Sequence, residues 1–277
     1  MDEIQLDHSF VPNVEGDIHV MSTKFGHKET CVFVHGFMGN GYWWHWLMPY
    51  LVEKYNLIII DLPGMGQSKD RITYSLSAMG SAIIEVIRHF EVNLKVHLIG
   101  HSFGALASGH ALIQSPNNIK SFHCIDMDLI HLQDESHPKM NTAPRRYHAN
   151  KETLMARFRL VPAETLCSKE AFHFLAQNSI HLFDQGWAWS FDPNILNTKK
   201  DNVLSAFKET VKTHHIPTQL VLGDKTTVLN LDKATNHWQL IMGNKQIKVM
   251  PGYHHLMLDD PKALALIIHQ FVSDLNE

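Results

Sequence analysis

The sequence predicts an α/β fold with a mostly parallel sheet flanked by helices. Short apolar runs rich in β-branched residues recur along the chain, and continuous apolarity is typical of strands that are buried on both faces, as in parallel sheets. Segments with the 3.6-residue period of amphipathic helices lie between these runs. Alternation of the two kinds of segment is the pattern of the α/β class.

Six of these runs are the predicted strands of the sheet. They are "TCVFV" (30–34), "NLIIID" (56–61), "KVHLIG" (95–100), "IKSFHCID" (119–126), "TQLVLG" (218–223) and "QIKVM" (246–250). An earlier pair of segments, at about 4–10 and 17–23, surrounds the turn "NVEGD" and predicts an antiparallel edge.

Two flanking helices are predicted from their apolar stripes. The stripes consist of Leu76, Met79, Ile83, Ile84 and Ile87, and of Leu264, Ile267, Ile268 and Phe271. The second helix is expected to begin at Asp260 and Pro261, because a cap residue followed by proline at the first helical position is a helix-start signal.

The alternation is interrupted between about residues 130 and 213. Within this stretch, "KETLMARF", "SKEAFHFLAQ" and "KKDNVLSAFKETV" have helical periodicity. We therefore expect a core domain formed by residues 1–129 and 214–277, with residues 130–213 inserted as a helical cap. A chain of 277 residues, 44% of them hydrophobic, is long enough for such a core and insertion.

The composition predicts which classes of partner the protein lacks and where in the cell it is located. The formal net charge is −4, with 24 basic and 28 acidic side chains and no run of basic residues longer than two, so a nucleic-acid partner is not expected. The acidic N-terminus has no signal-peptide core, and no apolar stretch is long enough to span a bilayer. These features predict a cytoplasmic protein without a membrane partner.

Neither the cysteines nor the histidines suggest a metal or cofactor. Cys31, Cys124 and Cys167 are widely spaced, and two of them lie in apolar runs, as expected of small buried side chains. Most of the 21 histidines are scattered singly, and no HExxH or Cys/His knuckle spacing accompanies them. We predict no metal site and no cofactor.

The stretch "LIGHSFGA" contains the strongest catalytic signal. Gly100 to Gly104 fits the pattern G-x-S-x-G, directly after an apolar strand and directly before an alanine-rich helix. A strained turn in this place exposes the serine hydroxyl, and small residues on either side allow the chain to bend tightly. Ser102 is therefore the predicted nucleophile.

A second turn, "VHGF", follows the predicted strand 30–34. The backbone after His35 and Gly36 can approach the serine closely, so the N–H groups of Phe37 and Phe103 are the predicted oxyanion hole. Removing one such donor costs about 3–4 kcal/mol in a known case. We expect the substrate pocket to include His35, Gly36, Trp43, Trp46 and His101. In the cap, Arg157, Arg159, Trp187 and Trp189 are candidates for its entrance.

Together these motifs resemble the α/β-hydrolase fold family. The resemblance rests on the turn at 35–37, "DLPGMGQS" (61–68), the GHSFG turn at 100–104 and "PGYHHLMLDDP" (251–261), which occur in the family's order and spacing. In the cap, "ARFRLVP" (156–162) and "GWAWSFDP" (186–193) look like segments of capped esterase-like members. The resemblance implies that a histidine in the loop after the last strand is the general base. His254 matches the family register, and His255 remains the alternative, better explained by solvation at the surface.

The acid that orients this histidine has two positions in the family. In the turn after the seventh strand, the register three residues after Gly223 falls on Thr226, which cannot serve as the acid, whereas Asp224 stands one residue after the glycine. At the end of the sixth strand, Asp126 matches the register of members that keep the acid there. The carboxyl edge of a parallel sheet is also where active-site groups converge. Asp126 is the leading candidate, with Asp224 and Asp128 as alternatives.

These residues predict a serine hydrolase, and more narrowly a carboxylesterase for small to medium acyl esters. Haloalkane dehalogenases and epoxide hydrolases of the family need a carboxylate nucleophile where this chain has Ser102. Alternative predictions are a thioester or C–C bond hydrolase with the same relay, or a small-molecule-binding protein that kept the fold without efficient turnover.

Overall fold

In the computed structural model, residues 4–27, 29–90, 95–133, 142–243 and 246–275 are described. Eight strands of this part of the chain form one sheet with the order β1-β2-β4-β3-β5-β6-β9-β10. These strands are β1 (Asp7–Val11), β2 (Ile18–Ser22), β3 (Thr30–Val34), β4 (Asn56–Ile60), β5 (Val96–His101), β6 (Ile119–Ile125), β9 (Thr218–Gly223) and β10 (Ile247–Met250).

The sheet is mostly parallel, as the apolar runs predicted. Strands β4, β3, β5, β6, β9 and β10 are parallel to their neighbours. The exceptions are β1 and β2, which pair antiparallel at one edge, and β2 is also antiparallel to β4. Every residue of β3, β4 and β9 is buried, which explains why these strands lack a polar alternation.

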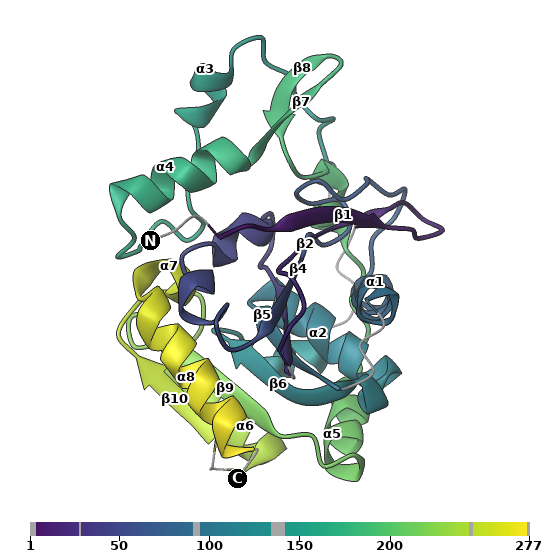
Figure 1. Ribbon diagram of the computed structural model, residues 1–277, viewed down its shortest axis with the longest axis vertical. Coiled ribbons are helices and arrows are strands. Elements are labelled where there is room, and N and C mark those ends of the chain that lie inside the picture. The colour runs from purple at the N-terminus through teal and green to yellow at the C-terminus, as the bar shows by residue number, and fades with distance from the viewer. Residues whose placement is uncertain (1–3, 28, 91–94, 134–141, 244–245, 276–277) are drawn as a thin grey trace.

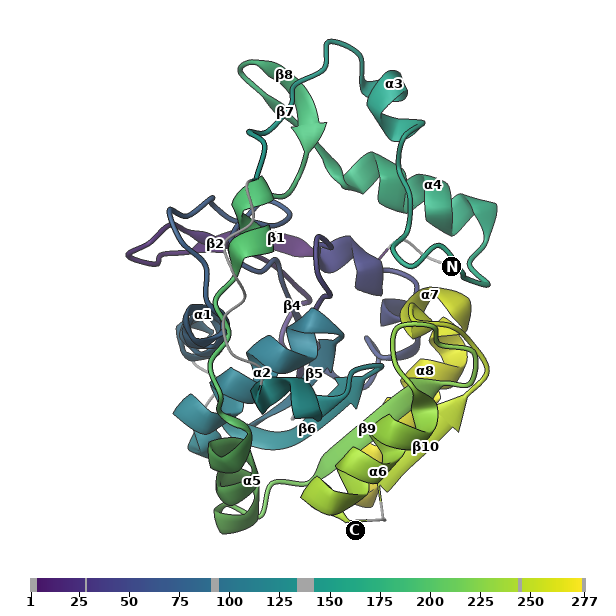
Figure 2. The ribbon, with the colours of Figure 1, turned by 180° about the vertical axis from the view of Figure 1, so that it is seen from behind.

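Helices cover both faces of the sheet (Figures 1 and 2). On one face, the apolar core includes side chains of α1 (Leu76–His89), α2 (Phe103–Gln114), α5 (Leu204–Thr213) and α6 (Leu231–Met242). On the other face, it includes side chains of α7 (Leu256–Asp259) and α8 (Pro261–Asp274) together with short 3₁₀ turns. The predicted start of α8 is confirmed, because Asp260 accepts the N–H of Ala263 through its side chain and Pro261 is the first helical residue.

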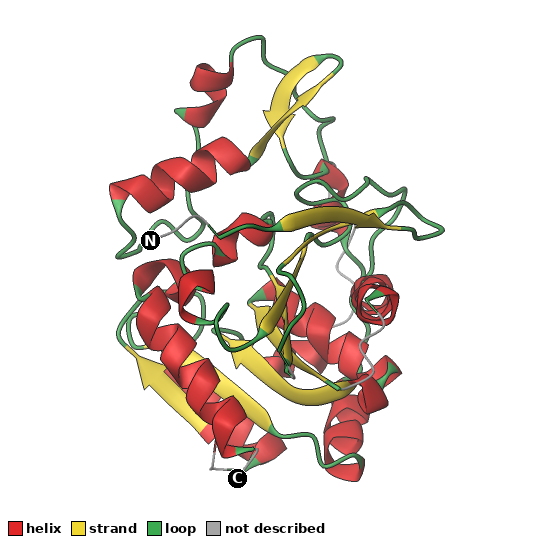
Figure 3. Ribbon diagram, viewed as in Figure 1, coloured by secondary structure: helices red, strands yellow, loops and turns green. Residues whose placement is uncertain are grey.

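The segment predicted as a cap contains both helices and strands. Helices α3 (Lys151–Met155) and α4 (Lys169–Asn178) and the antiparallel pair β7 (Ile180–Phe183) and β8 (Gly186–Trp189) lie together beyond one edge of the sheet (Figures 1 and 3). Helix α5 lies elsewhere, since Phe207 packs edge-on against Phe122 of β6 at 5.9 Å and belongs to the sheet's core. Residues 134–141 of the segment lie outside the described residues, and the boundaries of the cap stay a prediction.

No helix in the described ranges has the length and apolarity required to cross a membrane. Cys31 and Cys124 are buried and Cys167 is partly buried, and all three are free thiols.

Candidate active site

Ser102 occupies a sharp turn between β5 and α2. Its backbone has φ 52° and ψ −124°, a strained conformation for a residue other than glycine. Gly104 makes the turn possible, because a Cβ at this position would lie 2.3 Å from the carbonyl oxygen of His35. The following helix therefore packs directly against the end of β3, and Ser102 lies at the carboxyl end of β5.

The structure brings Ser102, His254 and Asp126 into one hydrogen-bonded chain. His254 lies in the loop between β10 and α7, and its Nε2 is 3.0 Å from Ser102 Oγ. Its Nδ1 is 2.7 Å from Asp126 Oδ2. All three residues are buried. Because a carboxylate only accepts, Nδ1 carries the proton and Nε2 presents its lone pair to the serine hydroxyl. This arrangement can remove a proton from Ser102.

Asp126 is held by contacts from the neighbouring strand and turn. The N–H of Gly223 donates to its Oδ1 at 3.0 Å, and the hydroxyl of Thr226 donates to its Oδ2 at 2.6 Å. The backbone of Asp126 has a positive φ of 46°, and its N–H donates to the carbonyl of Val221 at 2.8 Å. These bonds fix the carboxylate in the orientation that receives the histidine.

The two alternative acids have other partners. Asp224 is exposed and accepts the N–H of Gly252 at 2.9 Å. This bond joins the turn after β9 to the loop after β10. Asp128 accepts the N–H of Ile130 at 3.0 Å and pairs with Nδ1 of His237 at 2.7 Å. Of the three candidates, Asp126 is the aspartate that contacts His254.

His255 is buried, contrary to the expectation that it would be solvated at the surface. Its ring packs edge-on against Trp43 with 4.9 Å between the centroids, and its Nε2 is 3.3 Å from the carbonyl oxygen of Pro162. Burial, followed by the neighbouring His254, lowers the pKa of His255 to about 3. The loop turns one histidine toward the serine and the next into the protein.

Two backbone N–H groups are the candidates for the oxyanion hole: that of Phe37 in the turn after β3 and that of Phe103 at the start of α2. The rings of Phe37 and Phe103 pack edge-on with 5.2 Å between their centroids. Within the described residues, neither residue's N–H donates to another protein group. Phe103 is the first residue of α2, where an N–H has no helical acceptor and the helix dipole favours negative charge. Both groups are therefore available to an oxyanion.

A cavity of about 220 Å³ lies between this turn and the predicted cap segment. Its lining is mostly apolar and aromatic, with two guanidinium groups: Phe37, Met38, Trp43, Arg157, Phe158, Arg159, Val161, Ser179, Trp189 and Phe191. Trp43 thus lines the cavity, as do Arg157, Arg159 and Trp189 from the predicted cap segment. His35, Gly36, Trp46, His101 and Trp187 are outside this lining.

Two of the remaining predicted pocket residues, His35 and Trp46, make packing and hydrogen-bond contacts around the site. His35 is fully buried, where its Nε2 accepts the N–H of Leu62 at 3.0 Å and its Nδ1 is 2.8 Å from the carbonyl of Gly36. Burial lowers the pKa of His35, so the ring is neutral. Trp46 packs edge-on against Phe174 of α4. Both residues are close in sequence to the turn after β3, but this proximity does not tell whether a side chain packs in the core or lines the cavity.

His101 packs against the histidine of the relay. Its ring centroid is 4.7 Å from that of His254, and its Nε2 is 2.9 Å from the carbonyl oxygen of His254. Burial, followed by the neighbouring His254 and His255, lowers the pKa of His101 well below its usual value. A neutral ring here supports the loop that carries His254 without adding a charge.

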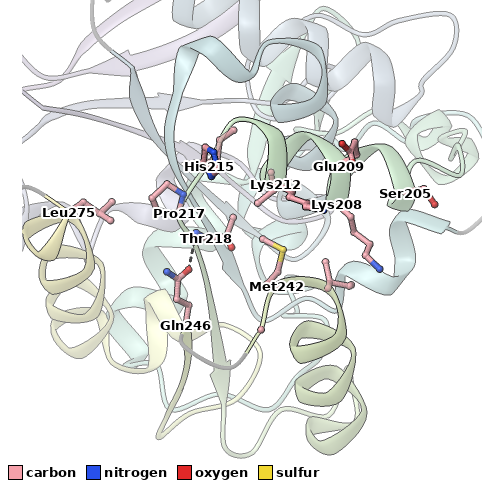
Figure 4. A pocket seen from close by; sticks show the side chains of 14 residues that line it. Ser205, Lys208, Glu209, Lys212, His215, Pro217, Thr218, Met242, Gln246 and Leu275 are labelled. Carbon is pink, nitrogen blue, oxygen red and sulfur yellow. Dashed lines mark hydrogen bonds between the residues drawn. The ribbon is translucent and has the colours of Figure 1, made fainter.

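A second hollow, of about 1030 Å³, opens near the amino-terminal ends of β9 and β10 (Figure 4). It is lined by Lys208 and Lys212 of α5 and by Thr218 at the start of β9. Gln246 occupies one of its walls and accepts the N–H of Thr218 at 2.9 Å. Ser102 follows the carboxyl end of β5, and β5, β6 and β9 are parallel. The hollow therefore lies at the other end of the strands from the relay.

Two polar residues of the site were missed by the sequence reasoning. Thr226 was excluded as the catalytic acid because it has no carboxylate. A hydroxyl at this position can, however, donate a hydrogen bond to the carboxylate that serves as the acid. Asp259 was used only to set the register of His254. Its Oδ2 accepts the N–H of Tyr253, and its Oδ1 accepts from Thr165 and Leu166 in the cap segment, all at 2.6 Å.

Residues 30–261 match the family described as the alpha/beta hydrolase fold. The chain belongs to the α/β-hydrolase fold family. This α/β hydrolase is 35% identical over 91 residues to an uncharacterized hydrolase of Bacillus subtilis, YugF, which covers 32% of the chain and 33% of the relative. It is 29% identical over 100 residues to the pimeloyl-[acyl-carrier protein] methyl ester esterase of Aeromonas hydrophila, covering 35% of the chain and 37% of the relative. The chain thus spans about a third of the length of these two relatives.

A longer match joins this α/β hydrolase to the mouse monoacylglycerol lipase ABHD6, which is 23% identical over 269 residues, or 91% of the chain and 77% of the lipase. Among solved structures, the thioesterase domain of the curacin biosynthetic pathway has a TM-score of 0.76 and 23% identity, with 95% of this chain and 99% of that chain covered. The structural likeness shows the shared fold, and the relatives include esterases and lipases.

Proposed function

We propose that this α/β hydrolase is a serine carboxylesterase that cleaves small to medium acyl esters. The observation that carries the proposal is the chain of contacts from Ser102 Oγ to His254 Nε2 at 3.0 Å and from His254 Nδ1 to Asp126 Oδ2 at 2.7 Å. A nucleophile, a base and an acid in this order form an acyl-transfer relay.

In the proposed reaction, Ser102 Oγ attacks the ester carbonyl while its proton passes to His254 Nε2. Asp126 stabilises the imidazolium that forms, and the N–H groups of Phe37 and Phe103 bind the oxyanion. The protonated histidine then gives its proton to the departing alcohol, which leaves an acyl group on the serine. His254 next activates a water molecule that releases the acid and restores Ser102.

The cavity at the turn after β3, which Phe37 and Trp43 help to line, supports the proposed substrate class. Its volume of about 220 Å³ and its aromatic walls suit a short or medium apolar acyl group more than a long chain. The proposed partner is accordingly a small-molecule ester. The same relay would also attack a thioester, which is the alternative substrate class.

Labelling and substitution of Ser102 test the proposal. We expect a fluorophosphonate to modify Ser102 and to abolish hydrolysis of p-nitrophenyl butyrate, and we expect Ser102→Ala to lose both properties. Full activity of Ser102→Ala would refute the proposal. Turnover of matched esters, acyl-CoA thioesters and vinylogous diketones by the wild-type chain would then rank the three bond types.

A further inference from the structure

Three buried histidines from two separate turns meet beside Ser102. His101 precedes the serine at the end of β5, and His254 and His255 lie in the loop before α7. One ring nitrogen of each histidine lies within 4.8 Å of a ring nitrogen of each of the other two. Within the described residues, this is the group of histidine, cysteine and acidic side chains that is close enough to hold a metal ion.

The hydrogen bonds determine which nitrogens have a free lone pair. A carbonyl oxygen only accepts, so the contacts with the carbonyls of His254 and Pro162 place the proton of His101 and that of His255 on Nε2. Their Nδ1 atoms are then unprotonated, and both are buried without a hydrogen-bond partner. Burial of an unpaired acceptor is costly, which makes these two atoms unexplained by the fold alone.

Each of the three rings also has the outer contact that metal-binding histidines have. In such sites, the second ring nitrogen donates to a carbonyl or a carboxylate, which fixes the tautomer and orients the ring. His101 and His255 donate to carbonyls, and His254 donates to Asp126. Two lone pairs are thus left for a cation, at His101 Nδ1 and His255 Nδ1. A third, at His254 Nε2, accepts the Ser102 hydroxyl and becomes available when that hydroxyl turns away.

The backbone of Gly36 lies close to one of these nitrogens. A Cβ at Gly36 would lie 2.8 Å from His101 Nδ1 and 3.4 Å from Ser102 Cβ, so the lack of a side chain at Gly36 lets His101 Nδ1 lie near the serine. Zinc binds imidazole nitrogen at about 2.0–2.1 Å, which places tetrahedral ligands about 3.3 Å apart. The nitrogens of the cluster, which lie within 4.8 Å of one another, would have to draw together to that spacing when the ion binds.

We propose that His101, His254 and His255 form a binding site for a divalent transition metal such as Zn²⁺, and that the bound metal inhibits the hydrolase. Imidazole ligands favour Zn²⁺, Cu²⁺ and Ni²⁺ over Mg²⁺ and Ca²⁺. The metal occupies the lone pair of His254 Nε2, which is the acceptor for the Ser102 proton, so the serine is no longer activated. The neutral state of His101 and His255 at pH 7 means that no proton has to leave those two rings. The inhibition rests on the proposed function, whereas the metal binding does not.

Metal binding is measured first, without an activity assay. Purified full-length chain is titrated with ZnCl₂ by calorimetry and with CoCl₂ by visible absorption at pH 7.5. We expect one tight equivalent and an intense tetrahedral cobalt spectrum, and we expect both to be lost in His255→Phe and in His101→Phe. His214→Gln is the matched control, because it removes an exposed histidine that also stands beside another histidine. Circular dichroism identifies any variant that does not fold, and either variant alone suffices for the comparison.

Inhibition is measured second, with p-nitrophenyl butyrate and with fluorophosphonate labelling of Ser102. We expect Zn²⁺ to block both reactions of the wild-type chain, EDTA to restore them, and His255→Phe to need about 100-fold more zinc for the same effect. Unchanged zinc binding in both histidine variants, or its loss in the His214 control, would show an adventitious ion only and overturn the proposal. Tight binding at the cluster without inhibition would overturn the regulatory half. A chain without esterase activity that still binds zinc through His255 would refute the proposed function and leave the metal site supported.

Discussion

The hydroxyl of Thr226 donates a 2.6 Å hydrogen bond to Asp126 Oδ2, the same oxygen that contacts His254. Thr226 stands three residues after Gly223, at the register where other α/β hydrolases keep their acid. The two positions known for the acid are therefore adjacent in space. In this chain, one position supplies the carboxylate and the other supplies a donor that holds it.

Removing the Thr226 hydroxyl should slow turnover more than it weakens substrate binding. We expect Thr226→Val to lower kcat by about 10-fold, since a hydrogen bond to a charged group contributes roughly 1.5–3 kcal/mol and part of this supports the position of Asp126. KM should change little, because Thr226 is outside the cavity lining. Steady-state kinetics with a p-nitrophenyl ester measure both values. Thr227→Val is the control, because Thr227 is the exposed neighbour and should retain wild-type kinetics.

The identity of the acid is tested by comparing two aspartates. Asp126→Asn should lower kcat by several orders of magnitude, up to about 10⁴ as in the serine-protease example, because an amide disfavours the required tautomer of the histidine. Asp224→Asn keeps an oxygen that can accept the Gly252 N–H, so its kcat should stay close to that of the wild-type chain. A larger loss in Asp224→Asn than in Asp126→Asn would return the acid to the turn after β9.

The two guanidinium groups of the cavity predict a preference for acidic esters. Arg157 and Arg159 are exposed at a cavity that is otherwise mostly apolar, so an ester with a distal carboxylate should bind better than its neutral analogue. We expect Arg157→Gln to raise KM about 5-fold for a half-ester of a dicarboxylic acid, as an attraction of about 1 kcal/mol implies. The KM of the matched neutral ester should not change.

Arg146→Gln controls for the loss of one positive charge, because Arg146 is exposed and outside the cavity lining. An equal rise of KM for the neutral and the acidic ester in Arg157→Gln would show that the arginine contributes shape and not charge. High salt should diminish the difference between the two substrates, since exposed charges are screened.

The buried His255 predicts acid sensitivity of the fold. Its pKa is lowered to about 3 in the folded chain, below the value of about 6.5 of an unfolded histidine. Between these values the unfolded state binds an additional proton, so the free energy of unfolding is fully retained above pH 6.5 and falls as the pH decreases. The expected slope is about 1.4 kcal/mol per pH unit for this one group.

Urea denaturation at pH 7, 6 and 5 measures this slope. His255→Phe should have a shallower decrease of unfolding free energy with falling pH, by about one proton, whatever its stability at pH 7. His214→Gln, at an exposed site, should retain the wild-type slope. Identical slopes in His255→Phe and the wild-type chain would mean that the ring is protonated in the folded state.

The elements that the sequence predicted well are those encoded by local patterns. The strand β3 was expected at 30–34 and lies there. A strand that is buried on both faces is apolar throughout, so the ends of the apolar run mark the ends of the strand. The GHSFG turn was equally local. Helix α5 shows the limit of such patterns, since periodicity reveals an apolar face without revealing that Phe207 packs against Phe122.

The polar partners of the site were harder to predict. Thr226 and Asp126 are 100 residues apart in sequence, and the histidine cluster joins residues from two distant turns. Such contacts are created by the parallel order of β5, β6 and β9, which places the ends of these strands together. A motif identifies Ser102, but the path of the chain through space decides which distant side chains assist it.

Asp259 connects the predicted cap segment to the loop that carries His254. One carboxylate receives Tyr253, the residue before His254, and also receives Thr165 and Leu166 of the cap segment. The cap segment cannot lift away at this point without breaking bonds to the carboxylate that positions the histidine's loop. A displacement of the cap segment at Thr165 and Leu166 would therefore also disturb the loop that holds His254 against Ser102.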